Sequence, residues 1–376
     1  MKDARYTKLA EKLVNYSCRL QKGEKLLLET IGTEETLAKE IIRAVYAAGG
    51  QPFITIQNER LQKEWLMGQD GISVEALAAQ ARWDAARMAE MDAYIGLRLK
   101  DNLYDMAAIP SEINTRHSKH YLQPVHFDLR VPKTKWVVLR YPNPSMAQEA
   151  AMSTEDFEDF YFKVCNFDYA SMSRAMDPLL ELMKKADKVE INGPGVDLRF
   201  RIKNIGAVKC DGQCNIPDGE IYTAPVKESV EGWIKFNTPS PYQGKVYQNV
   251  ELTFKKGRIV EAKAASNTQD LQSIFSTDEG ARYIGEFAFG LHPAITKPMK
   301  DILFDEKISG SFHFTPGNCY DEADNGNKSS IHWDLVYIMR EEYGGGNIFL
   351  DGQLIQKNGL FIPEALQGLN PENLGF

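Results

Sequence analysis

The sequence has no long hydrophobic run. Nowhere among its 376 residues does it approach the roughly 18 consecutive apolar residues that a membrane-spanning helix requires. The N-terminal residues, MKDARYTKLA, also lack the apolar stretch of a secretory signal peptide. From these two absences we expect a protein that is neither inserted in a membrane nor exported by the usual signal.

Basic residues are outnumbered in this chain. It has 44 lysines and arginines against 52 aspartates and glutamates, which gives a net charge of −8. Proteins that hold phosphate backbones need a clustered excess of basic side chains. Nucleic acid is therefore not expected among the partners of this protein.

Cysteine is scarce as well, with five residues in the whole chain. An odd number of mostly scattered cysteines is typical of reduced thiols rather than of a disulfide framework. We therefore expect a cytoplasmic protein. The cysteines are Cys18, Cys165, Cys210, Cys214 and Cys319.

The first half of the chain lacks any nucleotide-binding motif, although its pattern is that of an α/β domain. Short apolar runs typical of buried strands alternate with stretches of helical periodicity, which predicts a mostly parallel sheet covered on both faces. Neither a G-x-G-x-x-G nor a Walker sequence follows a predicted strand, so we expect the sheet to be a scaffold. The predicted strands span 25–29, 51–57, 93–98 and 135–140, and the predicted helices between them include 37–48 and 74–90.

Three of the six histidines lie in the basic segment 116–126, between the last two of these strands. A metal site and a positive patch that receives a peptide carboxylate are two functional interpretations. No carboxylate or cysteine is interleaved with these histidines, so a solvated loop is the favoured interpretation.

From Lys188 onward the pattern changes to short strands separated by turns. Asp351-Gly352 and Asn358-Gly359 separate the last three predicted strands, as tight hairpin turns do. The fold class predicted from both halves is an α/β N-terminal domain with a mostly parallel sheet, followed by a mainly antiparallel β (α+β) catalytic domain. The predicted domains span residues 1–186 and 187–376.

His332 and Asp334 form a first candidate pair of metal ligands. They stand two residues apart in a segment that we interpret as a strand. Residues i and i+2 of a strand project from the same face, so the imidazole and the carboxylate are expected to point to one place. Taken alone, such a pair is more typical of exposed hydrogen-bonded side chains than of a metal site.

Three further residues of the second domain stand in unusual surroundings. Proline and glycine fix the backbone on either side of Glu220, and Glu286 is an acid within an apolar run. A buried carboxylate needs a cation or several hydrogen-bond donors. His313 alternates with two phenylalanines, a pattern that favours an imidazole facing away from them.

Around these residues the sequence resembles the thermophilic aminopeptidase family, which comprises metallopeptidases of the aminopeptidase T, aminopeptidase S and PepS types. The resemblance extends over nearly the whole chain and includes the order of the two domains. It implies a metal-dependent aminopeptidase that removes N-terminal residues from peptides with a free N-terminus, and it implies a homodimer. The segments that carry it are NIPDGEIYTAP at 215–225, GEFAFG at 285–290 and SIHWD at 330–334.

The resemblance also implies the residues of the site. The family's catalytic tyrosine falls on Tyr320. Segment 321–331 is shorter than the insert of some family members, so the wall of the pocket beside Tyr320 is expected to differ. The family's metal ligands fall on Glu220, Glu286, His313, His332 and Asp334.

The number of these ligands favours two divalent metal ions. A catalytic zinc usually keeps about three protein ligands and one open position, so five ligands are too many for one open site. If one carboxylate bridges, each of two ions has three ligands, but the sequence does not say which carboxylate this is. Oxygen and nitrogen donors suit zinc, cobalt or manganese, and the sequence does not choose among them.

The mechanism expected from this set is hydrolysis by an activated water. The water attacks the scissile carbonyl, and the Tyr320 hydroxyl donates a hydrogen bond to the oxygen that becomes negative. Two alternatives remain open. One is a dipeptidase or another two-metal amide hydrolase, and the other is a non-catalytic homologue that binds peptides or metal.

Overall fold

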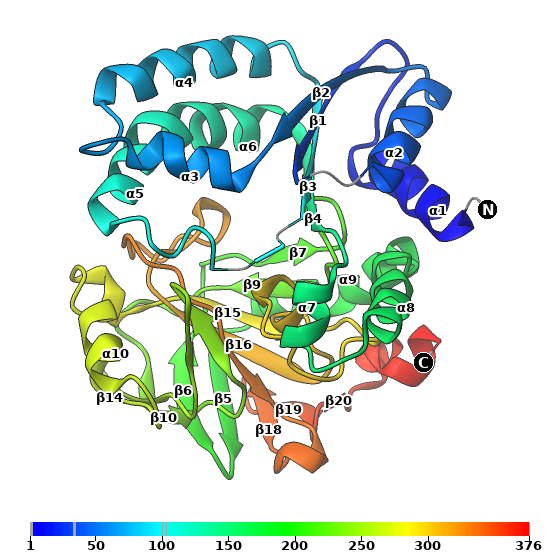
Figure 1. Cartoon of the computed structure of the whole chain (residues 1–376). Coiled ribbons are helices and arrows are strands. Elements are labelled where there is room, and N and C mark those ends of the chain that lie inside the picture. The colour runs from blue at the N-terminus through cyan, green and yellow to red at the C-terminus, as the bar shows by residue number, and fades with distance from the viewer. Residues whose placement is uncertain (1–2, 33–34, 100, 103, 376) are drawn as a thin grey trace. The chain divides into compact units, whose positions relative to one another are not determined.

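The computed structural model describes residues 3–32, 35–99, 101–102 and 104–375. The chain forms two compact units (Figure 1). One comprises Met1–Phe167 with Gly212–Ile216, and the other comprises Asp168–Asp211 with Pro217–Phe376. Helix α9 (Tyr169–Lys185) thus groups with the second unit, and the domain boundary after residue 186 stays a prediction. Among the described residues, no helix is both long and apolar enough to cross a membrane.

The first unit is built on a parallel sheet of five strands in the order β2-β1-β3-β4-β8. The inner strands β1 and β3 are almost entirely buried, because helices cover both faces. Figure 1 shows α1 and α2 on one side of the sheet and α3 and α4 on the other. The strands are β1 (Lys25–Ile31), β2 (Gln51–Gln57), β3 (Ala93–Arg98), β4 (Lys135–Arg140) and β8 (Asn215–Ile216). The helices are α1 (Ala4–Lys12), α2 (Thr36–Ala47), α3 (Glu59–Met67), α4 (Val74–Met88), α7 (Pro144–Glu149) and α8 (Thr154–Cys165), and the π-helix η1 (Leu13–Ser17) follows α1.

The histidine-containing segment 116–126 is helical, so the prediction of a solvated loop is wrong. Helix α5 (Ser111–His117) continues into the π-helix η2 (Ser118–Arg130), which leads to α6 (Val131–Lys133). Ile113, His117 and Val125 are buried, and the His117 ring stacks on Tyr121 with 5.1 Å between centroids. These residues recur every four positions, a helical period that the basic composition of the segment concealed.

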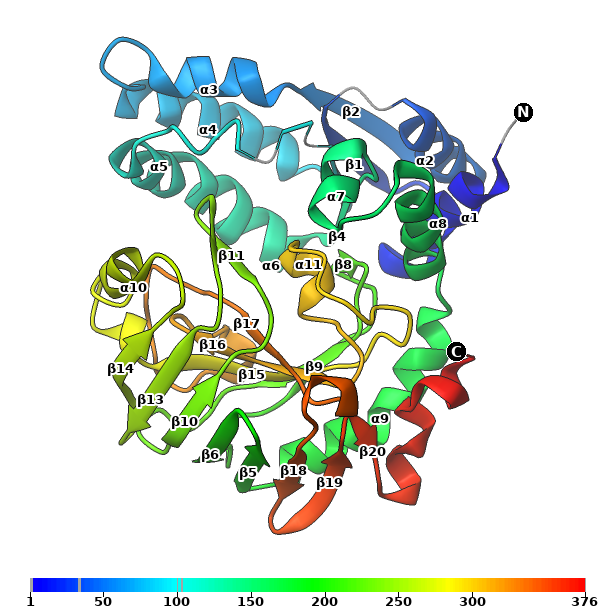
Figure 2. The same ribbon diagram turned by 60° about the horizontal axis from the view of Figure 1, so that its bottom comes forward.

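The second unit is mainly antiparallel β, and together with the first unit it confirms the predicted fold class. Its larger sheet has eight strands in the order β14-β13-β10-β6-β5-β18-β19-β20. Figure 2 shows β14, β13 and β10 side by side at one end of this sheet. The strands are β5 (Lys188–Gly193), β6 (Val196–Arg201), β10 (Glu231–Lys235), β13 (Glu251–Lys255), β14 (Arg258–Lys263), β18 (Asn347–Leu350), β19 (Gln353–Lys357) and β20 (Leu360–Phe361).

The predicted turns join the strands of this sheet. The Asp-Gly pair lies between β18 and β19, and the Asn-Gly pair lies between β19 and β20. Asp351 and Asn358 adopt the left-handed backbone with φ of 49° and 50°, which short polar residues tolerate in hairpin turns. The final meander is therefore as the sequence predicts.

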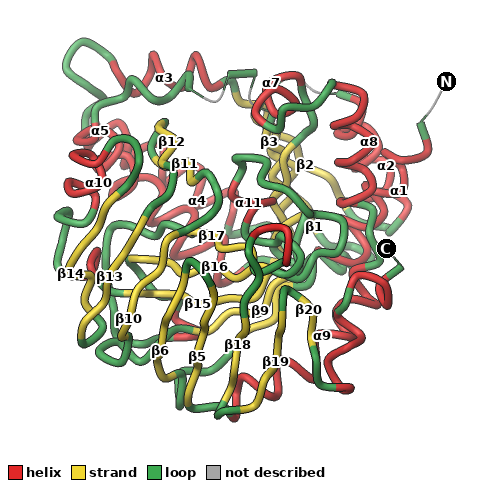
Figure 3. The backbone as a smooth tube through the Cα atoms, turned by 90° about the horizontal axis from the view of Figure 1, so that it is seen from below, coloured by secondary structure: helices red, strands yellow, loops and turns green. Residues whose placement is uncertain are grey.

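A second antiparallel sheet of five strands, in the order β17-β16-β15-β9-β7, contains most of the candidate ligands. Figure 3 shows its strands β15 and β16 crossing β5, β6 and β10 of the larger sheet. A separate hairpin is formed by β11 (Ser240–Tyr242) and β12 (Lys245–Tyr247). The strands of the second sheet are β7 (Val208–Cys210), β9 (Glu220–Thr223), β15 (Ile284–Gly290), β16 (Ser311–Pro316) and β17 (Leu335–Ile338), and the unit also contains α10 (Thr268–Ile274) and α11 (Ile302–Asp305).

Phenylalanines join the two sheets of the second unit. The Phe200 ring, from β6, lies 5.1 Å from the Phe287 ring of β15 and 5.2 Å from the Phe314 ring of β16. Burying each such side chain contributes about 1.5–3 kcal/mol. Because side chains alternate along a strand, this apolar face leaves Glu286 and His313 on the opposite face of the same two strands.

The short segment 321–331 is tied down by two asparagines. Asn327 is fully buried, and its Nδ2 donates to the carbonyl oxygens of Gly317 at 2.6 Å and Gly280 at 2.9 Å. The Asn325 Nδ2 donates to the carbonyl oxygens of Pro225 and Ile284. These bonds satisfy buried backbone carbonyls and fix the path of the chain between Tyr320 and His332.

Gly317 is expected to be indispensable for this path. It has φ of +113° and forms a single β-bridge with His332, and an added Cβ would stand 2.1 Å from the Ile331 carbonyl oxygen. Gly317→Ala should therefore lower the free energy of unfolding by more than about 3 kcal/mol in urea titrations. Gly326→Ala is the matched control, because Gly326 also has positive φ but open space around it. The control should lose only about 1–2 kcal/mol, and equal losses in the two variants would refute this account of Gly317.

Candidate metal centre

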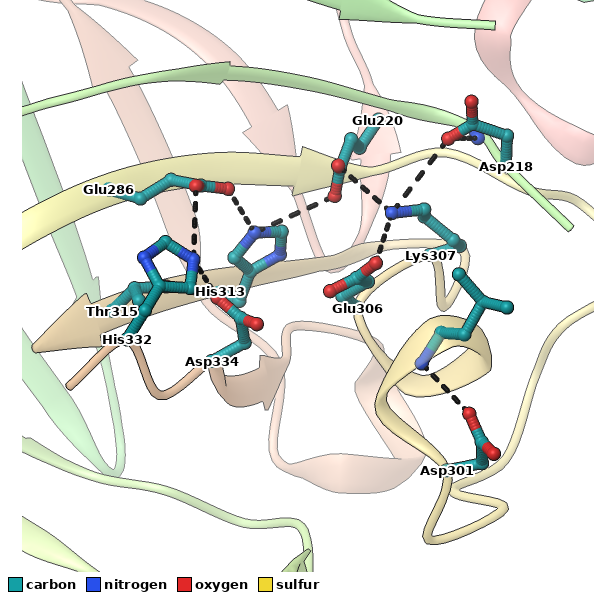
Figure 4. A network of polar contacts seen from close by, with 12 residues as sticks. Asp218, Glu220, Glu286, Asp301, Glu306, Lys307, His313, Thr315, His332 and Asp334 are labelled. Atoms are coloured by element: carbon teal, nitrogen blue, oxygen red, sulfur yellow. Dashed lines mark hydrogen bonds and ion pairs between the residues drawn. The ribbon is translucent and has the colours of Figure 1, made fainter. Parts of the chain in front are cut away.

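The five predicted ligand residues lie together in the second unit, and Figure 4 shows their side chains directed toward one another. Glu220 is the first residue of β9, Glu286 lies in β15, and His313 lies in β16. In the ladder between these strands, Ala288 pairs with His313 and Gly290 pairs with Glu220. The small residues of β15 leave this face to the imidazole and the carboxylates.

Glu220, Glu286 and His313 form a first group of donors. The His313 Nε2 lies 2.8 Å from the Glu286 Oε1 and 3.6 Å from the Glu220 Oε2. All three residues are buried. One donor atom from each lies within 4.8 Å of the others, a spacing at which they could hold one metal ion.

Glu286, His332 and Asp334 form a second group with the same spacing. The His332 Nε2 lies 3.2 Å from the Asp334 Oδ1 and 3.6 Å from the Glu286 Oε2. Glu286 thus belongs to both groups, with one carboxylate oxygen facing each histidine. It is the carboxylate whose geometry suits a bridge.

His332 and Asp334 do not lie within a strand, and this part of the prediction is wrong. His332 makes an isolated bridge with Gly317, and strand β17 begins only at Leu335. The neighbouring strand β16 does reach these positions, and the Trp333 N–H donates to the Pro316 carbonyl oxygen, but proline has no N–H with which to return the bond, so the ladder is interrupted there. The two side chains nevertheless meet, because the intervening Trp333 is buried against Tyr242 and Tyr247.

Two residues that the sequence reasoning missed orient the second group. The His332 Nδ1 donates to the Asn318 carbonyl oxygen at 2.8 Å, which directs Nε2 toward the carboxylates of Glu286 and Asp334. The Thr315 hydroxyl donates to the Asp334 Oδ1 at 2.7 Å. Partners of this kind fix the direction of ligands around a metal. Thr315 follows His313 by two residues, so strand alternation could have identified it.

The site contains buried acceptors that the protein itself does not satisfy. The Glu220 Oε2 and the Glu286 Oε2 have no hydrogen-bond partner within the part of the chain that the structure describes. Burying an unmatched carboxylate oxygen is costly, and a divalent cation would compensate it. The oxygen and imidazole donors of this set therefore fit a divalent metal ion.

A buried lysine, also missed from the sequence, lies at one side of the first group. The Lys307 Nζ is 2.9 Å from the Glu220 Oε1, contacts the Glu306 Oε1 and lies 3.8 Å from the Asp218 Oδ1. Burial lowers the pKa of Lys307, but these carboxylates outweigh it and raise that pKa well above its ordinary value. The local sequence gives no signal for Lys307, which follows Asp305 and Glu306 and has the pattern of an exposed charged segment.

Tyr320 lies beside the second group. Its ring is 4.8 Å from the His332 ring and 5.6 Å from the Tyr222 ring, measured between centroids. The residue as a whole is 46% exposed. Desolvation and the charges of Glu286 and Asp334 raise the pKa of the Tyr320 hydroxyl well above its ordinary value, so it stays protonated as a donor.

The metal-free site holds protons on its histidines. Although burial opposes it, the hydrogen bond and charge of Glu286 raise the pKa of His313 to about 9, and the carboxylate of Asp334 raises the pKa of His332 to about 10. Burial raises the pKa of Glu286 and brings that of Glu306 to about 8. Cations at this site must therefore compete with protons.

Comparison with known proteins decides the family. The family described as thermophilic metalloprotease (M29) matches residues 2–359. The chain belongs to this family. This membership confirms the resemblance seen in the sequence and makes the chain a metalloprotease, which is a hydrolase that requires divalent metal.

The relatives of this chain include proteins named as aminopeptidases, and two of them match most of its length. Aminopeptidase PepS of Streptococcus thermophilus is 22% identical and the match covers 95% of each chain. Aminopeptidase T of Thermus thermophilus is 24% identical over 92% of this chain and 95% of the relative. Aminopeptidase AmpS of Bacillus subtilis is 33% identical over a shorter part, 44% of this chain and 43% of the relative.

Solved structures share the fold of this M29 chain. Wild-type AmpT from Thermus thermophilus superposes with a TM-score of 0.76 at 20% identity, over 96% of this chain and 99% of the other. A 2,5-dihydroxypyridine dioxygenase from Pseudomonas putida KT2440 superposes with a TM-score of 0.60 at 14% identity and the same coverage. These likenesses support the two-domain fold, and the function must be argued from the site.

The raised histidine pKa values predict how metal and pH act together on stability. Folding raises the pKa values of His313 and His332 above the ordinary value of 6.5. Proton binding therefore stabilises the metal-free protein fully below pH 6.5. This stabilisation is lost as the pH rises toward the folded-state pKa values of about 9 for His313 and about 10 for His332. Divalent metal competes better as the protons leave. The difference in melting temperature between metal-loaded and chelator-treated protein should therefore widen from about pH 6.5 to about pH 9. A difference that stays constant or narrows over this range would contradict the assignment.

Proposed function

We propose that this protein is a metal-dependent aminopeptidase that hydrolyses N-terminal residues from peptides at a site for two divalent ions. The observation that carries the proposal is the pair of overlapping donor groups that share Glu286, in a chain of the M29 metalloprotease family. The names of the relatives, which are aminopeptidases of the PepS, T and AmpS types, support the peptide substrate.

In this proposal each ion has three protein ligands. Glu220, Glu286 and His313 hold one ion, and Glu286, His332 and Asp334 hold the other. Three ligands per ion leave room for substrate and water, as catalytic sites require. Zinc, cobalt and manganese all suit these donors, and when bound such ions polarise a carbonyl and make water acidic.

The side chains around the ligands have separate roles in this mechanism. Thr315 and the Asn318 carbonyl hold Asp334 and His332 in place, which keeps the second donor group ready for its ion. The protonated Tyr320 hydroxyl donates a hydrogen bond to the substrate carbonyl oxygen, where negative charge develops during attack by water. Its partly exposed ring places it where a peptide can reach.

We also propose that the protein acts as a homodimer in the cytoplasm. None of the five cysteines forms a disulfide within the described residues, as expected in a reducing compartment. Strand β2 is an outer strand of the parallel sheet, and its side chains Phe53, Ile54 and Ile56 are exposed. An apolar outer strand of this kind offers a surface to a second copy.

Activity with chosen peptides tests the proposed function. Metal-stripped protein reconstituted with zinc, cobalt or manganese should release successive N-terminal residues from a tripeptide and should hydrolyse aminoacyl-p-nitroanilides. The same tripeptide with an acetylated N-terminus should stay intact, because the reaction requires a free amine. Cleavage of dipeptides alone would favour the dipeptidase alternative, and no hydrolysis with any of the metals would contradict the enzyme.

The role of Tyr320 is tested by Tyr320→Phe. Removing a donor to a developing oxyanion typically costs about 10²–10³ in turnover. We therefore expect kcat to fall by that factor, while the metal content measured by elemental analysis stays unchanged. Tyr343→Phe is a matched control, since it removes a hydroxyl from a tyrosine that packs against Arg340. A Tyr320→Phe enzyme as fast as the unmodified enzyme would show that the hydroxyl takes no part.

A further inference from the structure

In the part of the chain that the structure describes, a buried lysine lies at one side of the proposed metal site. Lys307 follows helix α11, its side chain is fully buried, and its Nζ lies 2.9 Å from the Glu220 Oε1 (Figure 4). The same Nζ contacts Glu306 and lies 3.8 Å from Asp218. Among the residues that the structure describes, Glu220 is the one proposed ligand with which Lys307 forms an ion pair.

On the other side of the site, no lysine or arginine of the described residues forms an ion pair with Glu286 or Asp334. Asp334 accepts its hydrogen bond from the neutral Thr315 hydroxyl, and the His332 Nδ1 donates to a neutral backbone carbonyl. The groups that hydrogen-bond Asp334 and His332 from behind are therefore neutral, and a divalent ion held there with Glu286 is not repelled by them. An ion held by Glu220, Glu286 and His313 meets an ammonium bound to one of its three ligands.

Lys307 affects the ion beside Glu220 in two ways. It occupies the Glu220 Oε1, so one oxygen of that carboxylate is already matched by a positive charge. Its charge also repels a second cation nearby, and Glu306 and Asp218, which face the same Nζ, offset only part of that charge. Both effects weaken an ion beside Glu220, and neither acts through a contact with Asp334.

We propose that Lys307 is a built-in cation that makes the two metal positions unequal. The position formed by Glu286, His332 and Asp334 binds its ion first and tightly, and the position formed by Glu220, Glu286 and His313 binds its ion second and more weakly. This inference rests on the proposed two-metal function. It makes Lys307 a positioning residue for Glu220 and makes the fully loaded state dependent on the free metal concentration.

Titration of the metal-stripped protein with Co²⁺ tests the inequality directly. Calorimetry and the visible absorption of bound cobalt should show two steps whose dissociation constants differ by at least about tenfold, in line with the effect that groups behind metal ligands have on affinity. Two steps of equal affinity would overturn the role of Lys307 and leave the two-metal proposal intact. No binding of Co²⁺ would contradict the metal site itself.

Two variants with opposite expected effects separate charge from simple packing. Lys307→Met removes the cation and should strengthen the weaker step about tenfold, so that the two steps merge. Above about pH 8, where Glu306 is ionised, Glu306→Gln removes one carboxylate that Lys307 contacts, leaves more of the lysine's charge on Glu220, and should weaken the same step. General damage to the site would weaken binding in both variants.

Each outcome has a definite meaning. Thermal unfolding of the metal-free variants shows whether they fold. If Lys307→Met does not fold, two equal steps in the unmodified protein, or a second step that is not weakened in Glu306→Gln, would still overturn the proposal. A weaker second step in a folded Lys307→Met would overturn the proposal, since Lys307 would then only orient Glu220. The proposal is established if the two Co²⁺ binding steps merge in Lys307→Met and the second step weakens in Glu306→Gln.

Discussion

A carboxylate buried in the middle of a β-sheet must be matched by positive charge, and the structure around Glu286 depends on this constraint. Strand β15 is buried along its whole length, with its phenylalanines packed against the larger sheet and Glu286 on the other face. His313 and His332 each face one oxygen of that carboxylate. Because one of those oxygens has no hydrogen-bond partner within the described chain, the arrangement suits cations on both sides of Glu286.

Much of the fold and part of the site followed from local pattern. The alternation of strands and helices, the hairpin turns at Asp351 and Asn358, and the alternation of His313 with phenylalanines are all set by neighbouring residues. Lys307 was missed because a buried ion pair depends on residues far apart in sequence, such as Lys307 and Glu220. The strand expected at 332–334 failed for a related reason, since its ladder depended on Pro316 of β16, which has no N–H to donate.

The reaction does not follow from the fold. The same architecture occurs in AmpT of Thermus thermophilus and, with a lower TM-score, in a dioxygenase of Pseudomonas putida. What favours peptide hydrolysis here is the M29 family membership together with the donors that meet at Glu286. The short segment between Tyr320 and His332, which the hydrogen bonds of Asn327 hold in place, also supports hydrolysis. It keeps the Tyr320 ring beside the imidazole of His332.

The central claim is that Glu286 is shared by two metal ions. Anomalous X-ray diffraction from crystals equilibrated with saturating zinc or cobalt tests it most directly. The account predicts two peaks roughly 3.5–4 Å apart, as in other two-metal hydrolases, with the Glu286 carboxylate between them. One peak bound by all the donors together, or two peaks without Glu286 between them, would contradict it.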